Sequence, residues 1–167
     1  TNALASSIVL VCRRRAAETV WENSMRTVVA KFGGTSLASA GQFRKTGRIV
    51  QEDSDRRFIV ASAPGKRFET DRKVTDLLLE CYELAAGGGA FEPCLYEVRA
   101  RFQEIVTGLS LSFPLDAEIE ALRDHLRNAP ERDYVLSRGE YLNARILADY
   151  LGFTFVDPEW CVCFDEA

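Results

Sequence analysis

A lysine and two adjacent glycines mark the place where this sequence could bind an anion. Lys31 lies near the end of an apolar run at 27–32, and Gly33 and Gly34 follow that run directly. Adjacent glycines let the backbone approach an anion closely and point its N–H groups at it. The ammonium of Lys31 and the start of a following helix would add positive potential. The spacing is neither a Walker A motif nor GxGxxG, so a simple turn remains open as the alternative.

Short apolar strands and amphipathic helices must position these residues. We expect strands at 27–32, 58–62 and 153–157, and helices at 40–51, 73–86, 96–108, 116–127 and 130–151. The resulting order, β-α-β-α-α-α-α-β, predicts an α/β fold, a three-layer α/β/α sandwich with a mainly parallel sheet. Ligands of such sheets bind beyond the carboxyl ends of the strands. The site is therefore expected just after Phe32, just after Ser62 and beside Asp157.

Composition and charge exclude several classes of protein. The chain has 167 residues, 47% of them hydrophobic and 28% charged, which is ordinary for about one globular domain. The net charge of −4 and the absence of a long basic stripe argue against binding of nucleic acid. No apolar stretch approaches the ~20 residues of a membrane helix, and the arginines at 13–15 follow the nearest apolar run instead of preceding it. We therefore expect a cytoplasmic protein without a membrane partner.

The cysteines do not suggest a metal site. They are five in number, scattered, and include no CxxC pair: Cys12, Cys81, Cys94, Cys161 and Cys163. The single histidine, His125, adds only one further nitrogen ligand. A Cys/His zinc site is therefore not expected, and the cysteines are interpreted as reduced structural thiols.

Both ends of the chain differ from its middle. The only methionine, Met25, directly precedes the first clear strand, whereas residues 1–24 contain no clear partner element. We expect residues 1–24 to be a leader or an extraneous segment, with a genuine helix continuing through 16–21 as the alternative. The final residues, 163–167, carry no helix-stop or turn signal, so we expect the domain to continue beyond them.

Three blocks of the sequence resemble aspartate kinases, within the amino-acid kinase family. The first block is Lys31-Phe32-Gly33-Gly34-Thr35-Ser36. The second is Val60-Ala61-Ser62-Ala63-Pro64-Gly65, followed by Lys73-Val74-Thr75-Asp76-Leu77-Leu78. The third is Ser137-Arg138-Gly139-Glu140, in a long helix. Their order along the chain makes a chance resemblance very improbable.

The resemblance implies a fold, a reaction and a domain organisation. The reaction is ATP + L-aspartate → ADP + 4-phospho-L-aspartate, the first step toward lysine, threonine and methionine. Residues 25–167 would be the N-terminal part of the kinase domain, without its Gly-Ser-Asp block and without the regulatory ACT-type domains. The chain alone would then be inactive. The resemblance also implies a homo-oligomer for the full-length protein.

Site roles follow from the same resemblance. Lys31 would supply positive charge to the transferring phosphoryl group and would be the catalytic residue, while Gly33, Gly34 and Ser36 would complete the phosphate site. Ser36 would order the loop or cap the next helix. Mg²⁺ would be held mainly by the phosphates of ATP, so no protein metal site is expected.

The same resemblance assigns the aspartate substrate to Ser62, Thr75 and Glu140. A carboxylate such as that of Glu140 can pair with the substrate ammonium, and a hydroxyl such as that of Thr75 can bond the substrate carboxylate. Two alternatives stay open: another amino-acid kinase with a different acceptor, or a non-catalytic half that needs a partner chain.

Overall fold

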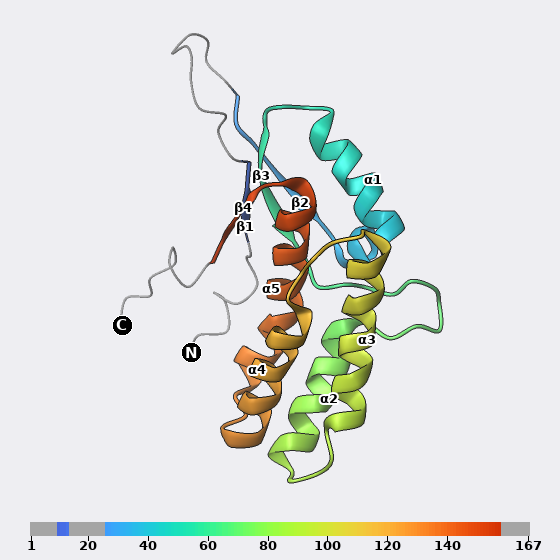
Figure 1. Ribbon diagram of the computed structural model, residues 1–167, viewed down its shortest axis with the longest axis vertical. Coiled ribbons are helices and arrows are strands. Elements are labelled where there is room, and N and C mark those ends of the chain that lie inside the picture. Colours follow the sequence, from blue (N-terminus) through green and yellow to red (C-terminus); the bar gives the residue numbers. More distant parts are fainter. Residues whose placement is uncertain (1–9, 14–25, 158–167) are drawn as a thin grey trace.

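The computed structural model describes residues 10–13 and 26–157. In chain order its elements are β1 (Leu10–Cys12), β2 (Val28–Phe32), the 3-10 turn η2 (Gly34–Leu37), α1 (Ala40–Gln51), β3 (Arg56–Ala61), α2 (Val74–Ala86), α3 (Glu92–Gly108), α4 (Leu115–Asn128), α5 (Arg132–Leu151) and β4 (Thr154–Val156). From β2 onward, this is the order of strands and helices that the sequence predicts. Figure 1 shows the strands gathered at one end of the molecule and the helices α2 to α5 extending away from them.

The four strands form one mixed sheet in the order β2-β3-β1-β4. β2 pairs with β3 in parallel, and β1 pairs antiparallel with both β3 and β4. Three of the four strands, β2, β3 and β4, therefore run in the same direction. The predicted α/β class with a mainly parallel sheet is confirmed.

β1 is an element that the sequence pattern does not predict. Leu10–Cys12 lies between β3 and β4, with Val11 opposite Ile59 on one side and Phe155 on the other. Val11 is fully buried. The expectation that nothing in residues 1–24 pairs with the fold is therefore wrong for β1, because three residues are too few to show a strand period. The alternative helix at 16–21, Met25, Cys161 and Cys163 lie outside the described residues.

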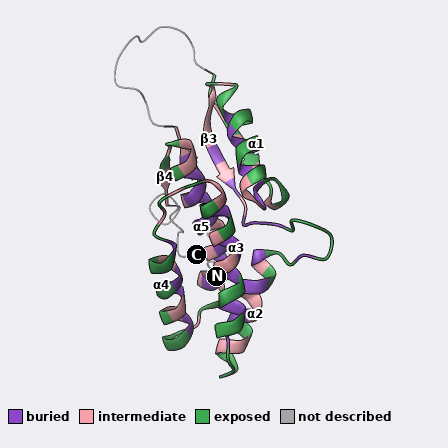
Figure 2. Ribbon diagram, turned by 45° about the vertical axis from the view of Figure 1, so that its right-hand side comes forward, coloured by how far each residue is buried: buried purple, intermediate pink, exposed green. Residues whose placement is uncertain are grey.

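The helices that flank the sheet lie on one of its faces. α1 packs against α5, where the rings of Phe43 and Tyr150 lie 6.5 Å apart and Gly47 faces the Tyr150 ring. Because α1 and α5 contact each other, they cover the same face of the sheet. Right-handed crossovers from β2 to β3 and from β3 to β4 also place them on one face, since both crossovers move in the same direction across the sheet. Figure 2 shows the buried residues of these helices turned toward one another and toward the strands. Within residues 26–157 the expected sandwich is thus represented by the sheet and one helical layer.

Strand alternation follows this arrangement. In β3, Ile59 and Ala61 are buried under the helices, whereas Phe58 and Val60 point to the opposite face and are half-buried. In β2 the residues on that opposite face are Val29 and Lys31, which are both exposed. The helix-covered face therefore belongs to the core, and the side chain of Lys31 lies outside it.

The remaining helices form a bundle in which α2 contacts α3, α4 and α5. The end of α2 is set by a glycine run in which Gly88 has a φ of 71°. Gly152 ends α5 with a φ of 67°, a left-handed conformation that favours glycine. α3 begins at Glu92 instead of Tyr96, because Pro93 occupies its first turn, where a missing N–H costs nothing. No helix in the described residues is long and apolar enough to cross a membrane.

Candidate active site

Two loops meet at the carboxyl ends of β2 and β3, and a pair of glycines makes the meeting possible. The backbone N–H of Gly65 donates to the carbonyl of Gly34 at 2.9 Å, and the N–H of Ser62 donates to that of Phe32 at 3.1 Å. A Cβ on Gly34 would lie 2.7 Å from the carbonyl oxygen of Ala63. One on Gly65 would lie 2.7 Å from the carbonyl carbon of Gly34. Only glycine fits at both positions.

Gly33 differs from its neighbour, because nothing in the described structure requires it to be glycine. Its φ of −74° and ψ of 167° are open to any residue. A Cβ at Gly33 would meet no described atom within 4 Å, and the residue is exposed. This glycine keeps a patch of backbone bare beside the strand end, which is the geometry that close approach of an anion needs.

Lys31 and Ser36 stand on either side of the glycines. Lys31 is exposed on the face of the sheet that the helices leave open, opposite Val60 of β3. Ser36 lies within η2, where its N–H donates to the carbonyl of Gly33 at 3.0 Å and its own carbonyl accepts from the hydroxyl of Thr46 at 3.0 Å. Ser36 therefore orders the loop through its backbone. It does not cap α1, because Ser39 does: its Oγ accepts the N–H of Gln42 at 3.4 Å.

Helix α5 delivers Glu140 to the loop after β3. Gly139 lets the helix approach closely, since a Cβ there would lie 2.9 Å from the Cβ of Ala63. Burial raises the pKa of Glu140 above its ordinary value, because desolvation penalises the charged form more than the nearby backbone N–H groups of Glu140 and Ala63 favour it. A cationic ligand group would relieve that penalty.

Asn143, one turn beyond Glu140, ties α5 to the end of β3. The residue is fully buried, and its Nδ2 donates to the carbonyl of Ser62 at 2.6 Å. Its Oδ1 is buried without a partner in the described part of the chain. Asn143 is not among the site residues that the sequence predicts. The signal that could have indicated it is a polar amide on the buried, otherwise apolar side of the helix.

Thr75 lies in the first turn of α2, beside the loop that follows β3. The N–H of Val74 donates to the carbonyl of Pro64 at 3.1 Å, so the first turn of α2 is fixed to the loop that carries Ser62. Thr75 is half-buried in that turn. Hydrogen bonds and packing thus bring together the segments that hold Gly34, Ser62, Thr75 and Glu140, whereas Lys31 is placed by its position in β2.

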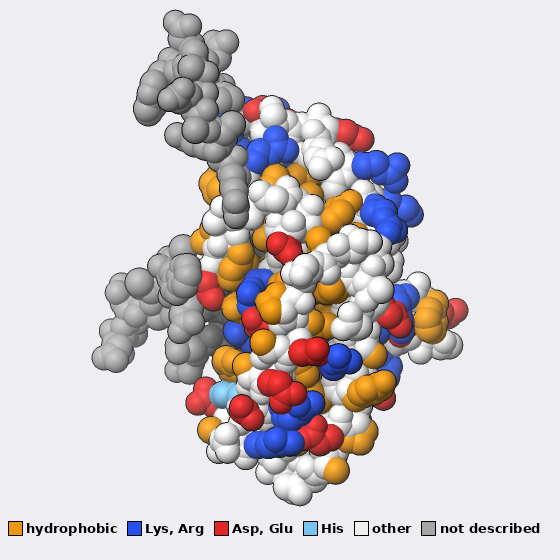
Figure 3. All heavy atoms as spheres, in the orientation of Figure 1, with side chains coloured by type: hydrophobic (Ala, Val, Ile, Leu, Met, Phe, Trp, Pro, Cys, Tyr) orange, Lys and Arg blue, Asp and Glu red, His pale blue; other side chains and the backbone are white. Residues whose placement is uncertain are grey.

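The described residues show neither a large patch of one charge over the helical end of the molecule (Figure 3) nor a group of side chains suited to a metal ion. Figure 3 shows acidic and basic side chains interspersed over the helical end of the molecule. In residues 10–13 and 26–157, no group of three or more His, Cys, Asp or Glu side chains could hold a metal ion. Cys12, Cys81 and Cys94 are all free thiols.

Known proteins with similar sequences are aspartokinases, although no family model matches the chain. Aspartokinase 3 of Bacillus subtilis strain 168 is 38% identical over 141 residues, which is 79% of this chain and 30% of that protein. The aspartokinase of Chlamydia pneumoniae is 28% identical over 127 residues, 74% of this chain and 27% of that protein.

Solved structures agree with the sequence relatives. The aspartate kinase of Clostridium acetobutylicum superposes with a TM-score of 0.74 at 41% identity, over 76% of this chain and 29% of that one. E. coli aspartokinase III, in complex with aspartate and ADP, gives a TM-score of 0.59 at 26% identity, over 75% of this chain and 29% of that one. The resemblance to aspartate kinases is confirmed, and the chain spans about three tenths of the length of these relatives.

Proposed function

We propose that this chain, whose relatives are aspartate kinases, forms the N-terminal part of a catalytic domain that transfers the γ-phosphoryl group of ATP to the side-chain carboxylate of L-aspartate. The observation that carries the proposal is the glycine turn at the end of β2. Gly34 is required by its contact with Gly65, whereas Gly33 stays bare where an anion could approach. The proposal assigns residues 25–167 to this domain part, together with β1, which pairs with β3 and β4 of the same sheet.

The reaction suits the residues of this site. The attacking aspartate carboxylate has an ordinary pKa of about 3.9 and is ionised at neutral pH, so no general base is needed. What the protein must supply is position and positive charge around the phosphoryl group. Exposed Lys31, two residues before Gly33, would supply that charge, and the turn from Gly33 to Ser36 would hold the phosphates.

The aspartate would bind on the side of the loop after β3. Glu140 would pair with the substrate ammonium, which would compensate for the desolvation that raises its pKa. Thr75 would bond the substrate α-carboxylate from the start of α2, and Ser62, which directly follows β3, would be a neighbouring contact. The two substrates would then meet at the carboxyl end of the sheet, as in other open α/β sheets.

Further properties belong to the proposal through the relatives. Mg²⁺ would be coordinated mainly by ATP phosphates, since ligands of this cation are oxygens and it keeps several waters. The product, 4-phospho-L-aspartate, would serve lysine, threonine and methionine synthesis. The protein would act in the cytoplasm, and the full-length enzyme would be a homo-oligomer.

An assay of ADP release tests the proposal. Because the chain spans about three tenths of its relatives, residues 1–157 are joined to the C-terminal remainder of the Clostridium acetobutylicum enzyme, giving a fusion enzyme. The fusion enzyme is offered MgATP with L-aspartate, L-glutamate or N-acetyl-L-glutamate. We expect ADP release that depends on L-aspartate, and a kcat lowered by orders of magnitude in Lys31→Ala but not in Lys45→Ala, which changes an exposed lysine of α1.

Three other results of this assay would contradict the proposal in whole or in part. Release that depends on another acceptor would assign the site to a different amino-acid kinase. An unchanged rate in Lys31→Ala would remove this lysine from the mechanism. If no acceptor stimulates release from a folded fusion enzyme, the proposed function is wrong.

A further inference from the structure

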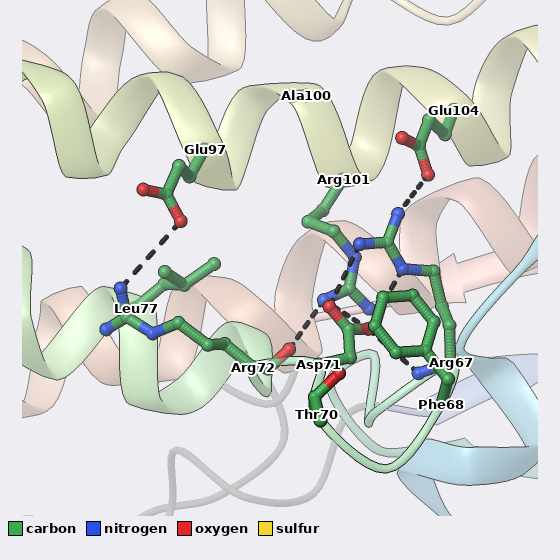
Figure 4. Close-up of a pocket in the computed structure, with 10 residues that line it drawn as sticks. All are labelled: Arg67, Phe68, Thr70, Asp71, Arg72, Leu77, Glu97, Ala100, Arg101 and Glu104. Atoms are coloured by element: carbon green, nitrogen blue, oxygen red, sulfur yellow. Dashed lines mark hydrogen bonds and ion pairs between the residues drawn. The ribbon is translucent and has the colours of Figure 1, made fainter.

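A cluster of ion pairs lies next to the glycine turn and is not explained by substrate contacts. It surrounds a cavity of about 300 Å³ between α3 and the loop at 62–73 that joins β3 to α2 (Figure 4). Three arginines and three carboxylates line it: Arg67, Arg72, Arg101, Asp71, Glu97 and Glu104. Each of these arginines is paired with a carboxylate. The cavity therefore offers no unpaired arginine to an anion. A role in holding the loop at 62–73 explains the cluster better than a role in binding a ligand.

Arg101 fastens both ends of the loop to α3. Its guanidinium donates to the carbonyl of Gly65 at 2.7 Å and to the carbonyl of Arg72 at 2.6 Å. The same group lies 3.2 Å from the Asp71 carboxylate. The Arg101 side chain is only 6% exposed, so these contacts operate away from water, where a charged hydrogen bond is strong.

Asp71 closes the loop on itself. It is buried, and its carboxylate accepts from the backbone N–H of Arg67 at 2.8 Å and from the Arg67 side chain at 2.9 Å. The hydrogen bond from the Arg67 guanidinium holds the pKa of Asp71 well below its usual range. Arg67 also pairs with Glu104 on α3. Figure 4 shows Asp71 between the guanidinium groups of Arg67 and Arg101.

The contacts of Arg101 continue to the glycine turn through a single residue. The carbonyl of Gly65 accepts from Arg101, and the N–H of Gly65 donates to the carbonyl of Gly34 at 2.9 Å. Gly34 and Gly65 touch backbone to backbone, so a shift of one displaces the other. A rigid α3 is thereby coupled to the turn that follows β2.

We propose that Arg101 is a positioning residue, which holds Gly65 against Gly34 and so fixes the turn that would carry the phosphates of ATP. The importance of the turn for ATP rests on the proposed function, whereas the coupling itself rests only on the contacts above. Arg101 touches no substrate and acts through Gly65. A lysine at this position has one point charge in place of a planar fork and cannot bond two separate carbonyls and a carboxylate in the same geometry.

Amide hydrogen exchange on the 167-residue chain tests the coupling without any need for activity. The variant is Arg101→Lys, and its control is Arg99→Lys, two residues earlier on α3, where the arginine pairs with exposed Asp116. We expect the Gly65 and Val74 amides to exchange at least tenfold faster in Arg101→Lys, with the amides of α5 unchanged. The control should leave all of these rates at their original values.

Steady-state kinetics of the fusion enzyme test the consequence for ATP. We expect Arg101→Lys to raise the KM for ATP about tenfold, with a smaller effect on the KM for L-aspartate. A role limited to stability would lower Tm and the amount of active enzyme but leave both KM values unchanged. If the unsubstituted fusion enzyme releases no ADP, the proposed function fails, yet the exchange of Gly65 still decides the coupling.

Unchanged protection of Gly65 in a folded Arg101→Lys protein would overturn the coupling, and an unchanged KM for ATP would overturn its role at the phosphate site. If Arg101→Lys does not fold, Arg101→Gln replaces it, because the shorter neutral amide cannot bond the carbonyls of both Gly65 and Arg72. We then expect an increase in Gly65 exchange of similar size. No increase in that variant would equally overturn the inference.

Discussion

Gly33 and Gly34 are adjacent and identical, yet the structure gives them different roles. Gly34 is held in contact with the backbone of Ala63 and Gly65, so its lack of a side chain is a packing requirement. Gly33 has open space at its Cβ position and an ordinary extended backbone. Packing therefore accounts for Gly34, whereas nothing in the described residues accounts for Gly33. For Gly33 we propose a contact with the phosphates of ATP.

Alanine substitution should reveal this difference directly. Gly34→Ala places a Cβ 2.7 Å from the Ala63 carbonyl oxygen, and overpacking of this kind should cost about 1–3 kcal/mol of unfolding free energy. Gly33→Ala should leave stability unchanged or raise it by up to about 1 kcal/mol, because alanine restricts the unfolded chain. In the fusion enzyme, Gly33→Ala should still raise the KM for ATP about tenfold. Thermal melts and ATP titrations measure both effects, and equal KM values for Gly33→Ala and the unsubstituted enzyme would contradict the phosphate role.

The effect of Glu140 on the stability of the folded chain should depend on pH. Its pKa is raised by burial, so the folded protein binds this proton more tightly than the unfolded chain does. The contribution of Glu140 to stability is therefore greatest below the ordinary glutamate pKa of about 4.3, and is lost as pH rises through the raised value. Glu140→Gln should consequently melt higher than the original chain at pH 7. The two melting temperatures should converge below about pH 4, where glutamate is neutral in both states.

The same variant should weaken substrate binding. Loss of a charged partner for the substrate ammonium costs about 1.5–3 kcal/mol, so the KM of the fusion enzyme for L-aspartate should rise roughly 10- to 100-fold. The KM for ATP should change little. A variant that melts higher but binds aspartate normally would show that Glu140 is buried for another reason.

At the scale of elements, local patterns predict most of what the structure contains. The helix at 40–51 is predicted with its observed bounds because its apolar positions recur at a helical period and loops flank it. β1 could not be predicted, because a three-residue strand has no period and depends on pairing with β3 and β4, which are distant in sequence. The sequence offers Ser36 as a possible cap of the following helix, but Ser36 lies inside the four-residue turn η2, and Ser39 caps α1.

The residues of the candidate site also fall into two groups, those that a local pattern predicts and those that it does not. Residues at strand ends, such as Gly33, Gly34 and Ser62, are predictable because topology alone puts strand ends at the ligand side of the sheet. Asn143 and Arg101 are not, because each acts on a backbone carbonyl far away in sequence, at Ser62 and at Gly65. No local pattern encodes such a contact. The sequence therefore does not show these two supporting contacts, and the ligand-facing roles stay predictions.

A pair of valine substitutions tests whether β1 is a true part of the sheet. Val11 in β1 is fully buried, whereas Val29 in β2 is 60% exposed. Val11→Ala should cost about 2 kcal/mol, which lowers Tm by roughly 4–8 °C in a chain of this size. Val29→Ala should change stability by less than about 0.5 kcal/mol. Equal melting temperatures for the two variants would instead support the interpretation of residues 1–24 as extraneous.

At the scale of the whole molecule, the described residues form only one side of the proposed phosphate site. The helices lie on one face of the sheet, and Lys31 and Val29 are exposed on the other face. Gly33 is exposed as well. Charges and dipoles act strongly on a transition state only where water is excluded, because water screens them. In the described part of the chain, the lysine and the glycine of the proposed phosphate site are therefore open to solvent.

We accordingly expect the 167-residue chain alone to show no aspartate-dependent release of ADP, although it folds. The chain spans about three tenths of the aspartokinases that it matches, and the remaining length is available to close the site over Lys31 and Gly33. Adding the separately expressed C-terminal remainder of the Clostridium acetobutylicum enzyme should restore release, and the same mixture with Lys31→Ala should not. The measurement is a coupled ADP assay with circular dichroism to establish folding of each part. Turnover by the chain alone would mean that four strands and one helical layer suffice to exclude water, and the argument from exposure would then be wrong.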